Sequence, residues 1–205
     1  MKLKPSSKAW MHEHINDEFV KRAQKEGYRA RAAYKLTEID DKDKLIKPGM
    51  TIVDLGASPG SWSQVVAQRL KGQGRVIALD LLEMEPIKGV EFIQGDFRED
   101  TILKMLEKSL NNKKVDLVIA DMAPNMSGIA DVDQAGAAYL TELALEFSKD
   151  WLKPSGNFLV KVFIGVGFDE ILQNMRQMFD KVVTRKPKAS RGRSNEVYLL
   201  GLGLK

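Results

Sequence analysis

The stretch Met50-Thr-Ile-Val-Asp-Leu-Gly-Ala-Ser-Pro-Gly60 joins an apolar run to a turn that contains two glycines. The apolar run predicts a buried strand, and the residues that follow from Ser61 (SWSQVV) predict a helix. Gly56 and Gly60 allow the backbone to approach a ligand closely, while Pro59 stiffens the turn. A strand that turns into a helix in this way is typical of nucleotide-like cofactor sites in α/β enzymes. The alternative is a tight turn that binds nothing.

Strands and helices alternate beyond this turn. We predict strands at 51–55, 75–81, 90–93, 115–120 and 157–163, and helices from 61 to about 70 and near 101–110, 132–151 and 168–179. Such alternation indicates an α/β, Rossmann-like fold, with a mostly parallel sheet and helices on both faces. The last two predicted strands, 181–185 and 196–202, are joined by a loop too short for a crossover helix. We therefore expect them to form an antiparallel pair.

The length of 205 residues suits one compact domain with an additional segment. Apolar spacing at Ala33, Leu36 and Ile39 indicates a helix, and Lys47-Pro-Gly49 marks a boundary. We therefore predict a basic helical arm over residues 1–45 and a catalytic domain over 46–205.

The charge is distributed unevenly along the chain. Residues 1–35 carry a net charge of +5, residues 36–180 carry −7 and residues 181–205 carry +6. If the two basic ends meet in space, they form a positive surface suited to a polyanion such as nucleic acid. Otherwise they are two solvated tails.

The composition excludes several kinds of chemistry. The chain has no cysteine, which excludes disulfides and thiolate catalysis, and its two histidines are too few for a usual histidine-rich metal site. We therefore expect no metal. No apolar run approaches the roughly 20 residues of a membrane span, and the polar start lacks the apolar core of a secretory signal. We expect a cytoplasmic protein, a monomer, with no membrane contact.

The glycine pattern bears on which cofactor would bind. The turn lacks the middle glycine that admits the pyrophosphate of NAD, which weakens an NAD-dependent oxidoreductase without excluding it. Gly60 is followed by Ser61-Trp62 and not by the Lys-Ser/Thr of a phosphate-binding loop. Asp80, which ends the second strand, is placed like the acid that binds the ribose of an adenosine ligand, although it could equally cap a helix. Asp96, after the third strand, could accept the amine of adenine.

Six segments in order resemble one family over nearly the whole chain. They are Asp54-Leu-Gly-Ala-Ser-Pro-Gly-Ser-Trp62, Asp80-Leu-Leu82, Gln94-Gly-Asp-Phe-Arg98, Asp121-Met-Ala-Pro-Asn-Met-Ser-Gly128, Val160-Lys-Val-Phe163 and Ser190-Arg-Gly-Arg-Ser-Asn-Glu-Val-Tyr198. Together they are similar to the FtsJ/RrmJ-type ribosomal RNA ribose 2′-O-methyltransferases. One small departure is Ser61, where a glycine is expected.

The resemblance implies a fold, a cofactor and a substrate. The implied fold is a class I S-adenosylmethionine-dependent methyltransferase with a seven-stranded mixed sheet whose last strand is antiparallel. The implied methyl donor is S-adenosylmethionine, and the residues implied to bind it are Gly56, Pro59, Gly60, Trp62, Asp80, Asp96 and Asp121. The implied substrate is a uridine of large-subunit (23S) ribosomal RNA in an assembled or nearly assembled subunit. A transfer RNA anticodon-loop ribose methyltransferase and a non-catalytic RNA-binding factor are the alternatives.

Topology predicts a cluster of charges at one edge of the sheet. Asp121 ends the fourth strand and Lys161 lies on the fifth, so both belong at the carboxyl edge. Glu196 begins the last strand, and because that strand is antiparallel its start lies at the same edge. Only the resemblance adds Lys35, which with the other three matches the Lys-Asp-Lys-Glu catalytic set of the family.

Lys161 is the leading candidate to accept or orient the proton of the 2′-hydroxyl. A free lysine, with a pKa of about 10.4, is protonated at neutral pH, so a basic lysine needs burial or a second cation nearby. Lys35 could supply that cation, Asp121 would hold Lys161, and Glu196 would orient Lys35 or the ribose. The alternative for Lys161 is a strand-end lysine that reaches solvent.

The basic residues of the two ends are candidates for RNA binding. They are Lys21, Arg22, Lys25, Arg29 and Arg31 in the arm and Lys186, Lys188, Arg191 and Arg193 in the loop before the last strand.

Overall fold

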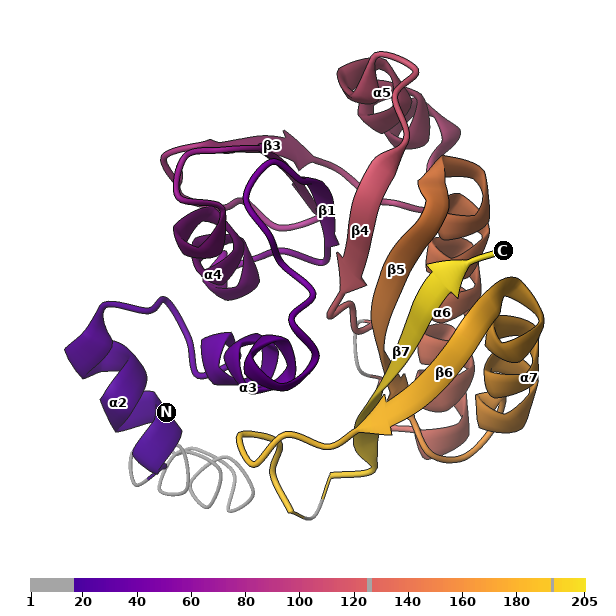
Figure 1. The fold of residues 1–205 in the computed structure, drawn as a ribbon. Helices are drawn as coiled ribbons and strands as arrows, with labels where there is room; N and C mark the ends of the chain where they lie inside the picture. The colour runs from indigo at the N-terminus through magenta and orange to yellow at the C-terminus, as the bar shows by residue number, and fades with distance from the viewer. Residues whose placement is uncertain (1–16, 125–126, 193) are drawn as a thin grey trace.

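The computed structural model describes residues 17–124, 127–192 and 194–205, in which seven strands form one sheet in the order β3-β2-β1-β4-β5-β7-β6 (Figure 1). The strands are β1 Thr51–Leu55, β2 Arg75–Asp80, β3 Val90–Gln94, β4 Val115–Ala120, β5 Leu152–Phe163, β6 Phe179–Arg185 and β7 Glu196–Leu204. The helices are α2 Glu18–Glu26, α3 Ala33–Asp43, α4 Ser61–Leu70, α5 Asp100–Leu110, α6 Ala130–Trp151 and α7 Phe168–Met178.

The sheet is mixed, and its last strand runs against the others. Strands β1 to β5 pair in parallel, whereas β7 pairs antiparallel with both β5 and β6. The predicted mixed sheet with an antiparallel last strand is confirmed. Strand β5 begins at Leu152, five residues before the predicted start. Val115 pairs with Leu152 and Leu117 pairs with Asn157, so Lys153-Pro-Ser-Gly156 bulges out within the strand.

Helices cover both faces of the sheet, as predicted. Helices α3 and α4 pack on one face, where Leu36 and Val65 join a buried cluster with Ile52 of β1. Helices α5, α6 and α7 pack on the other face, where Leu106 and Phe147 are buried against the alternate residues of the same strands.

The alternation of side chains along the strands decides which face carries the polar site. Tyr198 of β7 belongs to the cluster under α3 and α4, and it pairs in register with Lys161 of β5. Val160 and Val162 point into the opposite cluster, so Lys161 points to the α3 side. The side chains of Lys161 and Tyr198 therefore share the face on which α3 lies.

The described part of the arm forms two helices, α2 and α3, and the helix predicted from Ala33, Leu36 and Ile39 is α3. Helix α2 ends at Gly27, whose φ of 76° is left-handed, and α3 begins only at Ala33. Between them the chain makes bends and turns, and Arg29 donates hydrogen bonds to the carbonyls of Pro59, Glu85 and Pro86 at 2.6–3.0 Å, which holds this segment against the glycine turn.

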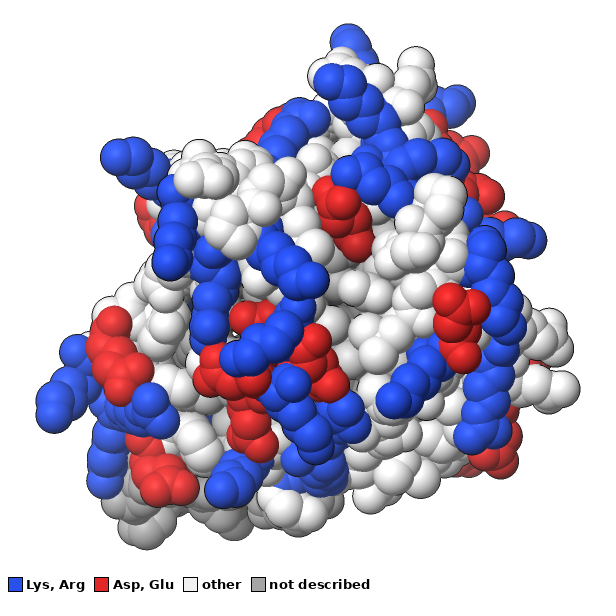
Figure 2. Space-filling view, in the orientation of Figure 1, with Lys and Arg blue, Asp and Glu red and all other residues white. Residues whose placement is uncertain are grey.

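The described part of the N-terminal basic segment contacts the basic loop before β7, so these two segments are not separate solvated tails. Arg31 donates to the carbonyl of Ala189, and the Lys188 amide donates to Glu38 of α3 at 2.8 Å. Figure 2 shows Lys and Arg side chains, mixed with acidic ones, over the lower part of the face where these segments lie in Figure 1. The division into an arm and a domain at residue 45 stays a prediction. None of the described helices has the length and apolar character of a membrane span.

Candidate active site

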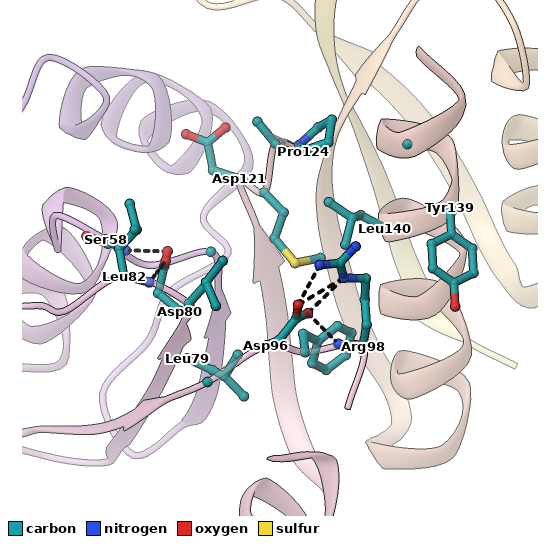
Figure 3. Close-up of a pocket in the computed structure, with 17 residues that line it drawn as sticks. Ser58, Leu79, Asp80, Leu82, Asp96, Arg98, Asp121, Pro124, Tyr139 and Leu140 are labelled. Atoms are coloured by element: carbon teal, nitrogen blue, oxygen red, sulfur yellow. Dashed lines mark hydrogen bonds and ion pairs between the residues drawn. The ribbon is translucent and has the colours of Figure 1, made fainter. Parts of the chain in front are cut away.

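A cavity of about 410 Å³ opens at the carboxyl ends of β1 to β4 (Figure 3). Three predicted acids, Asp80, Asp96 and Asp121, line it together with Gly56 of the glycine turn. The apolar part of its wall comes from Leu79, Met122, Pro124 and Leu140. A volume of this size is within the usual range for small-ligand sites. Parallel strands thus bring the ends of distant segments to one cavity, as predicted.

The carboxylate of Asp80 is held in a fixed position. Its two oxygens accept hydrogen bonds from the backbone amides of Ser58 at 2.8 Å and Leu82 at 2.7 Å (Figure 3). No helix follows Asp80 directly, which removes the helix-cap alternative. Each carboxylate oxygen has a further lone pair that can accept from a ribose hydroxyl.

Asp96 is paired with a residue that the sequence did not single out. The guanidinium of Arg98 lies 2.5 Å from one oxygen of Asp96 and 2.9 Å from the other (Figure 3). These hydrogen bonds lower the pKa of Asp96, which keeps it an ionised acceptor. Arg98 also lines the cavity. Its position two residues after Asp96 is the sequence signal that could have identified it.

The glycine turn reaches the cavity through Gly56 and Ser58. Only Gly56 of its predicted ligand residues lines the cavity, whereas Pro59, Gly60 and Trp62 do not. A Cβ on Gly60 would lie 2.7 Å from Ile87 and 2.8 Å from Arg29, so protein side chains occupy that space.

Trp62 is a core residue in this structure. Its side chain is buried, its indole N–H donates to the carbonyl of Ala32 at 2.9 Å, and its ring centroid lies 5.6 Å from that of Tyr198. The residue packs under α3 because its large apolar surface is buried there, and its contact with a cofactor stays a prediction.

The four predicted catalytic residues come together as two ion pairs. Lys161 Nζ lies 2.9 Å from Asp121 Oδ1 and donates to the Asp121 carbonyl at 2.9 Å. Lys35 Nζ lies 2.6 Å from Glu196 Oε1. The Lys161 side chain is only 8% exposed, so it does not extend into solvent.

Tyr198 connects the two ion pairs. Its hydroxyl lies 3.1 Å from Asp121 Oδ1 and 3.2 Å from Glu196 Oε1. Burial raises the pKa of Tyr198 well above its usual value, so the hydroxyl keeps its proton. This role of Tyr198 was not predicted, although the residue follows Glu196 by two positions on the same strand face.

A second cavity, of about 540 Å³, lies on the Lys35 side of the four residues. The arm lines it with Ala30, Arg31 and Ala32, and the terminal loop lines it with Ala189, Arg191 and Ser194. Lys35 and Glu196 face this cavity, whereas Asp121 faces the first. The four predicted catalytic residues thus lie between the first cavity, which three acids line, and the second cavity, which the arm and the terminal loop line.

The structure divides the predicted RNA-binding residues into groups. Lys21, Lys25 and Lys188 are exposed, and Arg191 lines the second cavity. Arg22 is exposed but pairs with Glu26 at 2.7 Å, and Lys186 donates to the carbonyl of Ser194. Arg193 lies outside the described residues.

Arg29 and Arg31 have structural partners. Arg29 is bound to backbone carbonyls, and Arg31 forms an ion pair with Asp17 besides its bond to Ala189. These bonds fasten the arm to the rest of the protein, and the RNA contact of the two residues stays a prediction.

Asp54, at the end of β1, is a buried acid beneath this site. Ser63 Oγ donates to its Oδ2 at 2.6 Å, whereas Oδ1 has no partner among the described residues. Burial, with the charges of Asp121 and Asp80 nearby, raises its pKa to about 7. In the described part of the chain, no group of three or more His, Cys, Asp or Glu side chains is arranged to hold a metal.

Comparisons with known proteins agree with this architecture. The family model of the FtsJ-like methyltransferases matches residues 28–204. The chain is 80% identical over 202 residues to the ribosomal RNA large subunit methyltransferase E of Methylobacillus flagellatus, with 98% of each chain covered. It is 63% identical over 203 residues to the protein of the same name from Nitrosospira multiformis, with 99% of this chain and 98% of the relative covered.

A solved structure is similar over most of the chain. It is the crystal structure of a Plasmodium falciparum protein described as a ribosomal RNA methyltransferase, with a TM-score of 0.78 and 34% identity, covering 86% of this chain and 98% of that one. The fold, the acid-lined cavity and these matches lead to one conclusion. The chain belongs to the FtsJ-like methyltransferase family, and its methyl donor is S-adenosylmethionine.

Proposed function

We propose that this methyltransferase methylates a ribose 2′-hydroxyl of large-subunit ribosomal RNA, at a uridine of an assembled or nearly assembled subunit. The observation that carries the proposal is the set Lys161, Asp121, Lys35 and Glu196 between two cavities. The name shared by the relatives supports the large-subunit RNA as the substrate. The proposal includes a monomer that acts in the cytoplasm without a metal.

The first cavity fits S-adenosylmethionine. We assign Asp80 to the ribose hydroxyls, since its carboxylate is already held by two backbone amides. We assign Asp96 to the amine of adenine, and Asp121 to the side of the cavity nearest Lys161. When bound, S-adenosylmethionine supplies an electrophilic methyl group.

The protein's own residues align the acceptor and remove its proton. Lys161 is positioned by the carboxylate and the carbonyl of Asp121, and we assign it to accept or orient the proton of the 2′-hydroxyl. Lys35 is held by Glu196 at the edge of the second cavity, where it can orient the ribose or its neighbouring phosphate. S-adenosylmethionine in the first cavity would supply the methyl group, and Lys161 in its neutral form would take the proton that leaves the 2′-hydroxyl. Alignment of this kind lowers barriers by about 7–11 kcal/mol in intramolecular models.

The RNA surface in this proposal consists of Lys21, Lys25, Lys188 and Arg191. They lie on the arm and the terminal loop, which contact each other around the second cavity. Exposed cations on a polyanion-binding face act mainly on phosphates, whatever the base sequence.

The test is methyl transfer by the purified protein. It is incubated with S-adenosylmethionine and large subunits that lack the modification, with transfer RNA in parallel, and the digested RNA is analysed for 2′-O-methylnucleosides by mass spectrometry. We expect 2′-O-methyluridine in subunit RNA. We expect Lys161→Ala to reduce transfer at least about 100-fold, as loss of a proton-transfer group commonly does.

Lys153→Ala is a matched control. Lys153 also lies on β5 and also pairs with an aspartate of β4, Asp116, at 2.7 Å, but it lies at the opposite end of the strand. It should retain full transfer. Methylation of transfer RNA alone would move the substrate to that class, and unchanged transfer by Lys161→Ala would remove the assigned role of Lys161.

A further inference from the structure

Tyr198 lies between the two halves of the catalytic set and belongs to neither ion pair. Its side chain is fully buried, its ring packs on Trp62, and the ammonium of Lys35 lies 5.7 Å from its ring centroid. Its hydroxyl is within hydrogen-bond distance of two carboxylates, those of Asp121 and Glu196. Packing in the core therefore holds the hydroxyl where it joins the two pairs.

A phenol has one proton, so its hydroxyl can donate fully to only one carboxylate at a time. A donated hydrogen bond stabilises the negative charge of the carboxylate that receives it and weakens the hold of that carboxylate on its lysine. Ser190 Oγ also donates to Glu196 at 3.0 Å, whereas Asp121 has Tyr198 as its side-chain hydroxyl partner among the described residues.

We propose that Tyr198 is a positioning residue of the methyl-transfer reaction, whose hydroxyl, shared between Asp121 and Glu196, sets how tightly Asp121 holds the proton on Lys161. The inference rests on the proposed function of the same site. When the hydroxyl donates to Asp121, the Lys161 ammonium loses part of its stabilisation and releases a proton more readily. When it donates to Glu196, the ammonium is held more firmly.

The charged groups that face this hydroxyl come from four elements. They are Asp121 after β4, Lys161 on β5, Glu196 on β7 and Lys35 on α3, and the buried acid Asp54 at the end of β1 acts on Asp121 through space. Removal of the hydroxyl leaves the carboxylates without their shared donor, so proton loss from Lys161 should require a higher pH.

The test compares Tyr198→Phe with Tyr34→Phe. Tyr34 is a matched control because it is also buried and its hydroxyl also donates to a carboxylate, Glu26, at 2.9 Å, but in the arm. We expect Tyr198→Phe to move the rising limb of the pH–rate profile up by about half a pH unit, the size expected when one hydrogen bond is removed. Below the midpoint this shift should lower kcat about threefold, with S-adenosylmethionine affinity unchanged. Tyr34→Phe should leave the profile in place.

A second measurement does not require the RNA substrate. The titration of Lys161 is followed by NMR in protein labelled with ¹³C-lysine, with Lys161→Arg used to assign its signal. Tyr198→Phe should raise the midpoint and Glu196→Gln should lower it, and the second shift should shrink in the double variant because it acts through Tyr198. If Tyr198→Phe is less stable than wild type, the Lys161 midpoint of Glu196→Gln is compared with that of wild type alone.

The outcomes separate this inference from the proposed function. A wild-type protein that methylates no RNA would contradict the proposed function. The titration of Lys161 would still test whether the Tyr198 hydroxyl couples Glu196 to Asp121. Superimposable Lys161 titrations in wild type and Tyr198→Phe, or fully additive shifts in the double variant, would overturn the inference even if the wild type methylates subunit RNA normally.

Discussion

Replacement of the buried acid Asp54 by asparagine should stabilise the protein at alkaline pH and change how its stability depends on pH. Asp54 is fully buried and its carboxyl accepts one hydrogen bond, from Ser63. Its charged form is therefore poorly solvated, which raises its pKa from 3.8 to about 7. Asparagine has the same shape and no charge, and its carbonyl oxygen can still accept from Ser63.

The wild type loses stability as the pH rises because its folded and unfolded chains release the Asp54 proton at different pH values. Below pH 3.8 both the folded and the unfolded chain hold the Asp54 proton. As the pH rises towards about 7, the unfolded chain releases this proton while the folded protein retains it, so the wild type loses stability across this range. A difference of about 3 pKa units corresponds to about 4 kcal/mol once the pH exceeds the folded-state value.

Two terms determine the net effect of the substitution. The variant avoids the loss of about 4 kcal/mol at pH 8, but its buried NH₂ group replaces an oxygen that already lacks a partner, which costs about 1–3 kcal/mol. We expect Asp54→Asn to be more stable than wild type by about 1–3 kcal/mol at pH 8 and less stable by a similar amount near pH 4. Between pH 5 and pH 8 the difference in unfolding free energy should change by about 3 kcal/mol.

Urea unfolding followed by circular dichroism measures this difference, provided that the m-value is the same for both proteins. Asp131→Asn, which removes the charge of an exposed aspartate in the first turn of α6, is the control and should follow the wild-type curve in shape. Parallel stability curves for wild type and Asp54→Asn from pH 5 to pH 8 would refute the argument, because they would mean that the carboxyl is already ionised throughout that range.

Two further predictions concern ligands. Asp80→Asn should weaken S-adenosylmethionine binding about 10-fold or more by calorimetry, since the charged acceptor fixed by Ser58 and Leu82 is removed; unchanged affinity would exclude Asp80 from the cofactor site. Lys21→Glu combined with Lys25→Glu should weaken RNA binding and make the plot of log affinity against log salt less steep, by about one unit for each phosphate that the lysines no longer neutralise. An unchanged slope would show that α2 does not contact RNA.

Much of the site could be predicted because it depends on strand ends. Asp80, Asp96 and Asp121 each follow an apolar run, and parallel strands place such ends at one edge of the sheet. The antiparallel direction of β7 brings Glu196 to the same edge. These relations require only the order and direction of the elements, which hydrophobic periodicity indicates.

The contacts between distant segments could not be read in this way. The sequence contains Trp62 and Tyr198 as two aromatic residues in separate segments, but packing places both under α3, where Trp62 fills the core and the Tyr198 hydroxyl bridges two carboxylates. Arg29 and Arg31 resemble RNA-binding residues in a basic segment, yet nearby carbonyls and Asp17 engage them.

The sequence by itself therefore determined the α/β order, the strand-end acids and the charge at the two ends of the chain, because these follow from local pattern and composition. Only the tertiary structure decided which cations are occupied by protein partners, that Asp54 is a buried acid, and that Tyr198 joins the two ion pairs. The physical reason is that burial and hydrogen-bond partners depend on which side chains meet across the fold, and residues far apart in the chain supply those partners.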